Sequence, residues 1–187
     1  SGGLDSSIVS SLVSRYVNNL QTFSIGLEGS EDLKYAQKVA DFLKTKHTNI
    51  IVKEEDFFNS INDVIYNIES YDTTTVRASV GNYLVAKYIK ENSECKVILN
   101  GDGSDELMGG YIYFHNSPNE YEFDKECKNL LSNIHYFDVL RSDRSISSNG
   151  LESRVPFLDL DFVKWYLSIP HHIRFHVNEK KIEKFLF

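Results

Sequence analysis

The feature that most constrains the fold of this chain is its first seven residues, Ser-Gly-Gly-Leu-Asp-Ser-Ser, which run directly into an apolar helical pattern. The adjacent Gly2 and Gly3 allow positive φ angles and a close approach of the backbone to a ligand, because neither carries a Cβ atom. Backbone N–H groups at the start of the following helix favour an anion, and the helix dipole adds partial positive charge there. The loop therefore predicts a phosphate-binding turn at the N-terminus of a helix.

A carboxylate at Asp5 distinguishes this loop from a simple phosphate cradle. A negative side chain repels a phosphate group unless a divalent cation lies between them. No lysine follows the glycines, so the loop differs from the GxxxxGKS/T loop of kinases and GTPases. We therefore predict a magnesium-dependent pyrophosphate site. An ordinary helix N-terminus capped by Asp5 or Ser6 is the structural alternative.

Composition limits the classes of protein to which the chain can belong. Its 187 residues, of which 41% are hydrophobic, suffice to bury one sizeable globular core. A net charge of −7 argues against a nucleic-acid-binding surface. No apolar run approaches the roughly 20 residues that span a membrane. Cys95 and Cys127 show neither metal-ligand nor disulfide spacing, which favours a reducing cytosol.

Apolar periodicity predicts alternating helices and strands in the first hundred residues. Helical spacing recurs in four segments, and three short apolar or β-branched runs are typical of buried strands. The expected helices are residues 6–17, 32–43, 54–68 and 77–90, and the expected strands are residues 22–27, 47–52 and 96–99. This order predicts an α/β fold with a parallel sheet and flanking helices.

From about Tyr111 the pattern changes to helices without a clear strand. We expect helices over residues 124–140 and 161–167, with a polar connection over residues 142–150. The chain is therefore predicted to combine a nucleotide-binding α/β core over residues 1–110 with a mainly helical section over residues 111–187.

Residues with special chemistry stand at the ends of predicted strands, where parallel sheets bind their ligands. One such segment is Ile25-Gly26, and another is Asn100–Glu106 (NGDGSDE), which carries two glycines and three carboxylates. Asp105 can join Asp5 in holding a Mg²⁺ ion, and the backbone near Gly101 can contact a nucleotide. A solvated acidic turn is the alternative for the second segment.

Two further polar segments carry residue types suited to substrate binding. Residues 71–79 (YDTTTVRAS) set Arg77 beside three threonines, and arginine binds carboxylate or phosphate groups through two parallel hydrogen bonds. Residues 150–159 (GLESRVPFLD) set Arg154 and Asp159 around a rigid proline-containing stretch. The alternatives are capping of a helix by Thr74 or Thr75, and a structural ion pair.

These motifs closely resemble the synthetase domain of glutamine-dependent asparagine synthetase, one of the PP-loop ATP pyrophosphatases. The resemblance extends from Ser1 to Lys184 and keeps the family's order of motifs: SGGLDSS, TFSIGL, ESYDTTTVRASVGNYL, GDGSDELMGGYIYFH and GLESRVPFLD. It implies an adenine-nucleotide alpha-hydrolase-like fold. β-Lactam synthetase is the nearest rival, and other PP-loop enzymes such as GMP synthetase share the first motif but not the later ones. A catalytically degenerate domain that only binds partners is the remaining alternative.

The resemblance implies a two-step ligase reaction. The family uses MgATP to convert the aspartate side-chain carboxylate into β-aspartyl-AMP and pyrophosphate, and ammonia from glutamine then gives asparagine and AMP. By the matching motifs, the ATP and pyrophosphate site would comprise Ser1, Gly2, Gly3, Asp5, Ser6, Ile25, Asn100 and Gly101. The substrate site would comprise Thr74, Thr75, Arg77, Arg154 and Asp159. Asp5 and Asp105 would hold Mg²⁺, and Asp102 and Arg77 would be the catalytic residues.

The chain departs from the family's pattern in its acidic loop. The family usually has SGEGSDE, so Asn100 replaces a serine and Asp102 replaces a glutamate implicated in forming or using the adenylate. The resemblance also implies parts outside the chain, namely an N-terminal glutaminase domain, a strand before Ser1 and a catalytic lysine segment beyond Phe187. We therefore expect an interior fragment of a cytoplasmic enzyme, inactive on its own, with small-molecule substrates. A homodimer is left open.

Overall fold

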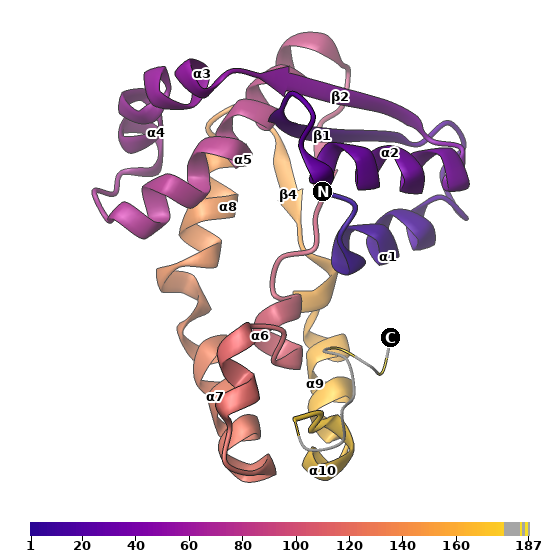
Figure 1. The fold of residues 1–187 in the computed structure, drawn as a ribbon, viewed down its shortest axis with the longest axis vertical. Coiled ribbons are helices and arrows are strands. Elements are labelled where there is room, and N and C mark those ends of the chain that lie inside the picture. Colours follow the sequence, from indigo (N-terminus) through magenta and orange to yellow (C-terminus); the bar gives the residue numbers. More distant parts are fainter. Residues whose placement is uncertain (178–183, 185, 187) are drawn as a thin grey trace. The chain divides into compact units, whose positions relative to one another are not determined.

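The computed structural model describes residues 1–177, 184 and 186 (Figure 1). It divides into two compact units, each built from two separate stretches of the sequence. Unit 1 contains Ser1–Asn100 and Val139–Arg154, and unit 2 contains Gly101–Asp138 and Val155–Phe187. The division into a nucleotide-binding part, residues 1–110, and a helical part, residues 111–187, remains a prediction. Each packing unit instead combines an earlier and a later stretch of the chain.

Unit 1 contains two short pairs of parallel strands. β1 (Gln21–Leu27) pairs with β2 (Lys46–Val52), and β3 (Val97–Leu99) pairs with β4 (Glu152–Arg154). The first three strands lie within one residue of the predicted segments. The α/β class with parallel strands is therefore confirmed, although the described strands form two sheets of two strands rather than one continuous sheet.

β4 contradicts the expectation that no strand follows Tyr111. Its sequence, Glu-Ser-Arg, has no apolar or β-branched side chain, so periodicity gives no sign of a strand. Pairing with the β3 segment supplies the reason for its extended backbone. Glu152 donates its N–H to the Lys96 carbonyl at 2.8 Å, and Asn100 donates its N–H to the Arg154 carbonyl at 3.1 Å.

The helices of unit 1 follow the predicted periodicity, but the helix predicted over residues 6–17 ends at Val13, the one predicted over residues 77–90 begins at Thr73, and two further predictions are wrong. The helices are α1 (Leu4–Val13), α2 (Glu31–Leu43), α3 (Glu54–Asn59), α4 (Ile61–Ile68), α5 (Thr73–Asn92) and nearly all of α8 (Asp138–Ser147). The single helix predicted over residues 54–68 is wrong, because the Ser60 hydroxyl donates to the Asp56 and Phe57 carbonyls and the helix breaks there. The polar connection predicted over residues 142–150 is wrong, because α8 continues to Ser147.

Two apolar clusters hold unit 1 together. In the first, α4 packs against α5 through Val64, Ile68 and Val80 (Figure 1). In the second, Ile89 of α5 packs with Ile146 of α8. Each fully buried aliphatic side chain of this kind contributes about 1.5–3 kcal/mol. Since Ile146 belongs to the segment predicted as a polar connection, its burial explains why that segment is helical.

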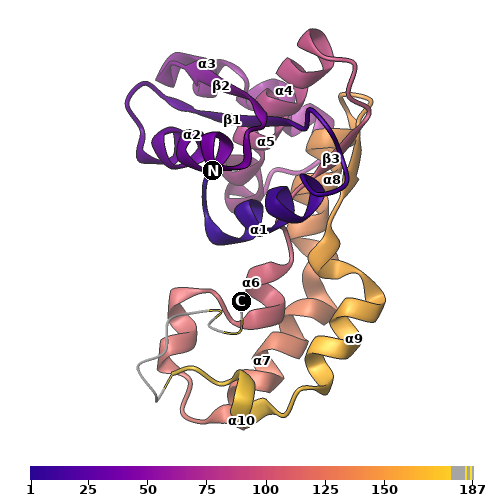
Figure 2. The same cartoon turned by 90° about the vertical axis from the view of Figure 1, so that its right-hand side faces the viewer.

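The regular elements described in unit 2 are all helical, as predicted for the later part of the chain (Figure 2). They are α6 (Ser104–Met108), α7 (Glu120–Asn133), α9 (Leu160–Ser168), α10 (His171–Arg174) and 3-10 turns over Ile112–Asn116, Ile134–Tyr136 and Pro156–Leu158. The single helix predicted over residues 124–140 is wrong, because α7 ends at Asn133 and a 3-10 turn precedes α8. None of the helices in the described part of the chain is long and apolar enough to cross a membrane.

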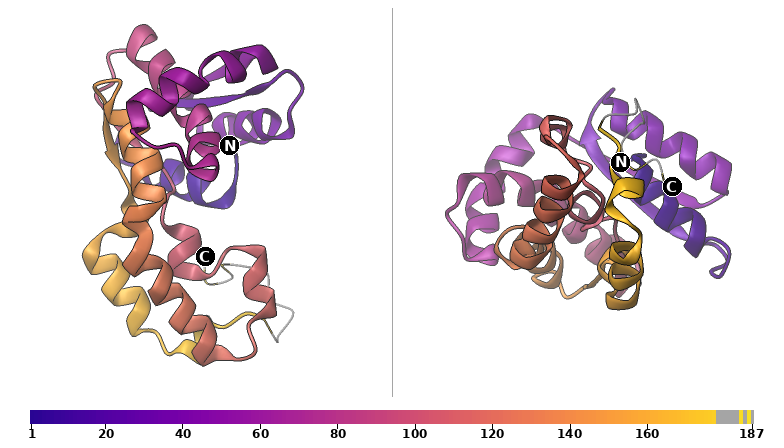
Figure 3. Two further views of the ribbon diagram at one scale, coloured as in Figure 1. Left: turned by 90° about the vertical axis from the view of Figure 1, so that its left-hand side faces the viewer. Right: turned by 90° about the horizontal axis from the view of Figure 1, so that it is seen from below.

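An aromatic cluster forms the core of unit 2. Phe114, Phe123, Cys127 and Phe175 are buried together, and the rings of Phe114 and Phe123 meet edge to face with centroids 5.1 Å apart. The cluster joins α7 to the residues that follow α10. Figure 3 shows the ribbon in two further views. Burial raises the pKa of the Cys127 thiol to about 12, so this cysteine has a packing role rather than that of a nucleophile.

Candidate functional site

The first loop of the chain ends in a helix start that no side chain caps. Gly3 is the N-cap of α1, in an extended conformation. The hydroxyls of Ser6 and Ser7 both donate back to the Gly3 carbonyl, at 3.2 and 2.7 Å, and Ser1 Oγ lies 3.2 Å from Ser6 Oγ. The alternative of a cap by Asp5 or Ser6 is therefore wrong, because both residues lie within the first turn of α1. The hydroxyls thus border a helix start whose N–H groups suit an anion.

Gly2 is required by the way this loop packs. Its φ of +73° lies in the left-handed region, and a Cβ atom there would lie 2.4 Å from the Tyr35 carbonyl carbon and 2.5 Å from the Ala36 nitrogen. Both contacts are with the backbone of α2, which cannot move aside like a side-chain tip. The glycine therefore allows the loop to lie directly against α2.

The end of β1 brings a second predicted residue into unit 1. Ile25 is half-buried, and the next residue, Gly26, lies close to the side chains of Ser30 and Leu33. A Cβ atom on Gly26 would lie 2.7 Å from Ser30 Oγ, just before α2 begins. The backbone at this strand end is therefore held close to the turn that leads into α2.

The threonine-rich segment belongs to α5 rather than preceding it. α5 begins at Thr73, and its cap is Asp72, whose carboxylate accepts hydrogen bonds from Thr75 N at 2.7 Å and Thr75 Oγ1 at 2.8 Å. These hydrogen bonds lower the pKa of Asp72. The alternative of capping by Thr74 or Thr75 is wrong. Thr75 is buried, whereas Thr74 and Arg77 are exposed on the first turns of the helix.

Asn100 joins three elements of unit 1. Its side-chain amide donates to Ser142 Oγ on α8 at 2.9 Å and lies 3.4 Å from Ser153 Oγ on β4. Its neighbour across the sheet, Arg154, donates to Glu152 Oε1 at 2.7 Å, and both of these side chains are 60% exposed. Arg154 therefore forms the structural ion pair that was the alternative to a substrate-binding role. The pair is exposed, and exposed ion pairs add little stability.

The acidic loop continues into unit 2, where Gly103 shapes it. Gly103 caps α6 with a φ of +85°, and a Cβ atom on it would lie 2.3 Å from the Leu158 side chain. Asp102 is half-buried in this turn. Asp159, a predicted substrate residue, caps α9 by accepting hydrogen bonds from the N–H groups of Asp161 and Phe162, each at 3.0 Å. Its carboxylate therefore has a structural role that the sequence did not indicate.

Asp105 lies in the first turn of α6 and contacts a lysine. Lys184 Nζ is 2.7 Å from Asp105 Oδ1, and the lysine side chain is only 6% exposed. The sequence did not single out this residue. It precedes the catalytic lysine segment that the resemblance implies beyond Phe187, and that segment stays a prediction. The structure places the buried Lys184 beside a predicted metal ligand.

A second buried carboxyl group follows Asp105 directly. Glu106 is 1% exposed and accepts a hydrogen bond from the Tyr111 hydroxyl. Burial raises the pKa of Glu106 to about 7; the Tyr111 hydrogen bond opposes this, while hydrogen bonding and charge from the nearby Asp138 add to it. The buried carboxyl group of Glu106 on α6 therefore titrates near neutral pH. Nothing in the sequence separated Glu106 from the other acids of its segment.

The predicted residues fall into two sets. Unit 1 holds Ser1, Gly2, Gly3, Asp5, Ser6, Ile25, Thr74, Thr75, Arg77, Asn100 and Arg154; unit 2 holds Gly101, Asp102, Asp105 and Asp159. Within unit 1, Ser1 contacts Ser6, and the backbone of Asn100 contacts that of Arg154. The shared Mg²⁺ ion of Asp5 and Asp105 stays a prediction, because these carboxylates belong to different units.

Comparisons with known proteins point to one family. The family model for asparagine synthase matches residues 1–124 and 116–186. The chain is 46% identical to the glutamine-hydrolysing asparagine synthetases of Homo sapiens, Mesocricetus auratus and Gallus gallus, over 192 aligned residues that include the whole chain. The same alignments cover 34% of each relative, so the chain spans about a third of their length.

Proposed function

Because the chain belongs to the asparagine synthase family, we propose that it carries the synthetase site of an enzyme that makes asparagine from aspartate, ATP and ammonia. The observation that carries this proposal is the 46% identity over the whole chain, because it includes all five motifs that bear the predicted site. The geometry of unit 1 supports it, since an uncapped helix start bordered by serine hydroxyls suits a pyrophosphate group.

In the proposed reaction, the aspartate side-chain carboxylate attacks the α-phosphorus of ATP. The bond between the α-phosphorus and the bridging oxygen breaks, and pyrophosphate leaves with its electron pair. The N–H groups of the first turn of α1 and the hydroxyls of Ser1 and Ser6 would stabilise the negative charge that develops on this leaving group. Ammonia then attacks the acyl carbon of β-aspartyl-AMP, and AMP leaves as asparagine forms.

Substrate aspartate would be bound at the start of α5. Arg77 is exposed there, and its guanidinium suits the α-carboxylate of an amino acid. Thr74 is exposed on the same turn, whereas the Thr75 hydroxyl already donates to Asp72. We therefore assign the direct contact to Thr74 and Arg77, and give Thr75 the role of holding the cap. Arg154 and Asp159 remain proposed contributors, as does Asp102 for the adenylation step.

The carboxylates of Asp5 and Asp105 fit the magnesium ion that the family implies. Asp105 already holds a cationic group, since its Oδ1 accepts the Lys184 ammonium. Among the described residues, no group of three or more His, Cys, Asp or Glu side chains could hold a metal. Mg²⁺ does not need such a group, because it binds to one or two carboxylates together with substrate phosphates. When bound, the ion would neutralise charge on the pyrophosphate.

The proposal extends to the whole protein. The relatives are named as glutamine-hydrolysing, so ammonia would come from glutamine through a glutaminase domain outside this chain. The two free cysteines agree with the proposed reducing cytosol. A homodimer remains part of the proposal on the resemblance alone.

Aspartate-dependent exchange of pyrophosphate into ATP by the intact protein tests this function. We expect exchange with Mg²⁺ and aspartate, and AMP rather than ADP as the product once ammonia is added. Stoichiometric ADP would contradict the proposal. A β-lactam-forming enzyme would instead use a larger carboxylate and need no ammonia. A degenerate domain would bind its partners but catalyse no exchange.

A further inference from the structure

Lys184 lies ten residues after Arg174, the last residue of α10. Lys184 follows α10 in the sequence and reaches back to Asp105 on α6, within the same unit. A lysine is rarely buried without a charged partner. The structure around Lys184 therefore has to keep its ammonium group at the Asp105 carboxylate. The contacts that fix the end of α10 are therefore the relevant ones.

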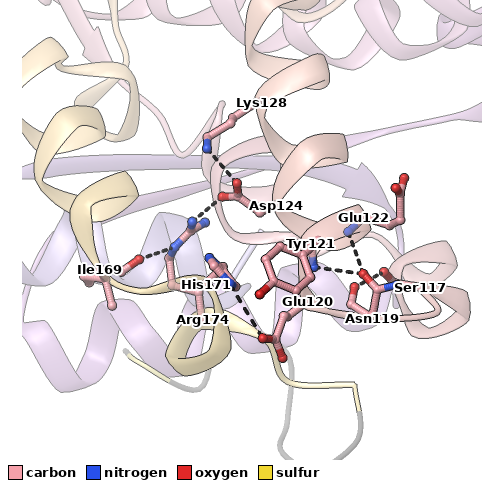
Figure 4. A network of polar contacts seen from close by, with 10 residues as sticks. All are labelled: Ser117, Asn119, Glu120, Tyr121, Glu122, Asp124, Lys128, Ile169, His171 and Arg174. Carbon is pink, nitrogen blue, oxygen red and sulfur yellow. Dashed lines mark hydrogen bonds and ion pairs between the residues drawn. The ribbon is translucent and has the colours of Figure 1, made fainter.

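Arg174, the last residue of α10, is buried to an unusual degree for an arginine, with only 3% of its surface exposed. Its Nε donates to the Ile169 carbonyl at 2.9 Å, and its Nη2 donates to Asp124 Oδ1 on α7 (Figure 4). Its guanidinium carbon also lies 5.7 Å from the centre of the Tyr166 ring. One side chain thus joins α10 to both α7 and α9.

Asp124 is held as a charged partner in this contact. Its second oxygen accepts a hydrogen bond from Lys128 Nζ at 2.6 Å, on the same helix (Figure 4). Burial alone would raise the pKa of Asp124, but the hydrogen bonds from Lys128 and Arg174 hold it below its usual value. The contact between Arg174 and Asp124 is therefore an ion pair with hydrogen-bonded geometry, of the stronger kind found in proteins.

α7 also contacts the residues immediately after Arg174. The Phe123 ring meets Phe175 edge to face at 5.6 Å and His176 at 5.3 Å between ring centroids. The same ring lies close to Gly109, where a Cβ atom would be 2.5 Å from its Cε2 and Cζ atoms, and Gly109 caps the C-terminus of α6. α7 therefore joins the exit from α10 to the helix that carries Asp105.

We propose that Arg174 is a positioning residue that fixes the end of α10 against α7 through Asp124 and thereby holds Lys184 at Asp105. The ion pair fixes the helix end, and the aromatic contacts of Phe123 transmit that position to α6. Any effect of Arg174 on pyrophosphate exchange rests on the proposed function. The claim that Arg174 holds Lys184 at Asp105 does not, and it is tested by how strongly Lys184 is protected from reaction.

The test is the rate at which an acetylating reagent modifies Lys184 in the intact protein, read for each lysine by mass spectrometry. Lys184 should react slowly, and the exposed Lys125 and Lys164 should react fast. In Arg174→Gln we expect Lys184 to react roughly tenfold faster, because local opening no longer has to break a charge-assisted hydrogen bond. Arg174→Lys keeps the charge and should restore part of the protection.

The matched control is Glu122→Gln, which removes the exposed ion pair between Lys125 and Glu122 on the same helix. It should leave the rate at Lys184 unchanged. Thermal unfolding establishes which variants are folded, and Asp124→Asn replaces Arg174→Gln if the latter does not fold. An unchanged rate at Lys184 in the folded variant would overturn the proposal, as would equal increases at all lysines. Absence of pyrophosphate exchange in the unmodified protein would count against the proposed function and leave the labelling result to decide the geometry.

Discussion

A Cβ atom on Gly110 would lie 2.0 Å from Oδ1 of Asp105, closer than two unbonded atoms can approach. The same position would lie 2.4 Å from Cε of Lys184. The absence of a side chain at residue 110 therefore allows the lysine to reach the carboxylate. Both atoms that the Cβ would meet are at side-chain ends, so a larger residue would separate the ion pair without unfolding α6.

We therefore expect Gly110→Ala to keep the fold and lose the contact between Lys184 and Asp105. Pyrophosphate exchange should fall by up to about 100-fold, the scale of a 1 Å misplacement in an active site. Gly81→Ala is the matched control, because nothing lies within 4 Å of a Cβ atom at that position. Near-normal exchange in a folded Gly110→Ala variant would mean that the pair of Lys184 and Asp105 is not needed for the reaction.

Asp5→Asn and Asp105→Asn should each abolish most adenylation while the protein stays folded. Each substitution removes a negative charge that would balance Mg²⁺, and loss of a metal ligand costs several kcal/mol of transition-state stabilisation. Pyrophosphate exchange measured over a range of Mg²⁺ concentrations checks this. Asp161→Asn serves as control, since that side chain is 96% exposed. Normal exchange by both variants at low Mg²⁺ would remove the two residues from the metal site.

Asp102 stands where the family usually has a glutamate, and its charge is the property we expect to matter. Asp102→Glu should retain asparagine formation, and Asp102→Ala should lose most of it. If the residue only shapes the turn between Gly101 and Gly103, alanine would lower the melting temperature slightly and leave turnover intact. Steady-state product formation, measured together with melting temperatures, distinguishes the two roles.

Glu106 should make the stability of the protein depend on pH. Burial raises its folded pKa to about 7, above the ordinary value of 4.5. The folded state therefore binds more protons between these values, so the stability contributed by the neutral carboxyl is present below pH 4.5 and is lost as the pH rises through 7. Glu106→Gln should remove this loss, which amounts to on the order of 3 kcal/mol.

Urea unfolding of both proteins at pH 5 and pH 8 measures this effect. The difference in unfolding free energy between Glu106→Gln and the unmodified protein should be larger at pH 8 than at pH 5. An equal difference at both pH values would show that Glu106 titrates like an exposed glutamate. Tyr113→Phe is a suitable control, because it removes a hydroxyl from the same region without changing a carboxyl group.

Local patterns predicted the elements whose side chains reveal their environment. β1 and β2 are apolar and β-branched, and α2 repeats apolar residues at helical spacing, so both kinds of element lie within one residue of their predicted positions. The breaks were not predictable in the same way. Ser60 ends a helix inside a run of continuous periodicity, because its hydroxyl competes for backbone carbonyls that the pattern assigns to the helix.

The sequence by itself determined the family and supplied the candidate residues of the proposed site, including the predicted phosphate loop, because these depend on residue types at short spacing. Tertiary structure alone decided that Lys184 lies against Asp105, that Asn100 donates to Ser142 and that Arg174 is buried against Asp124. Each contact joins residues more than 40 positions apart. Local periodicity says which face of an element is buried, but not which distant segment covers it, and that choice is made by packing of the whole unit.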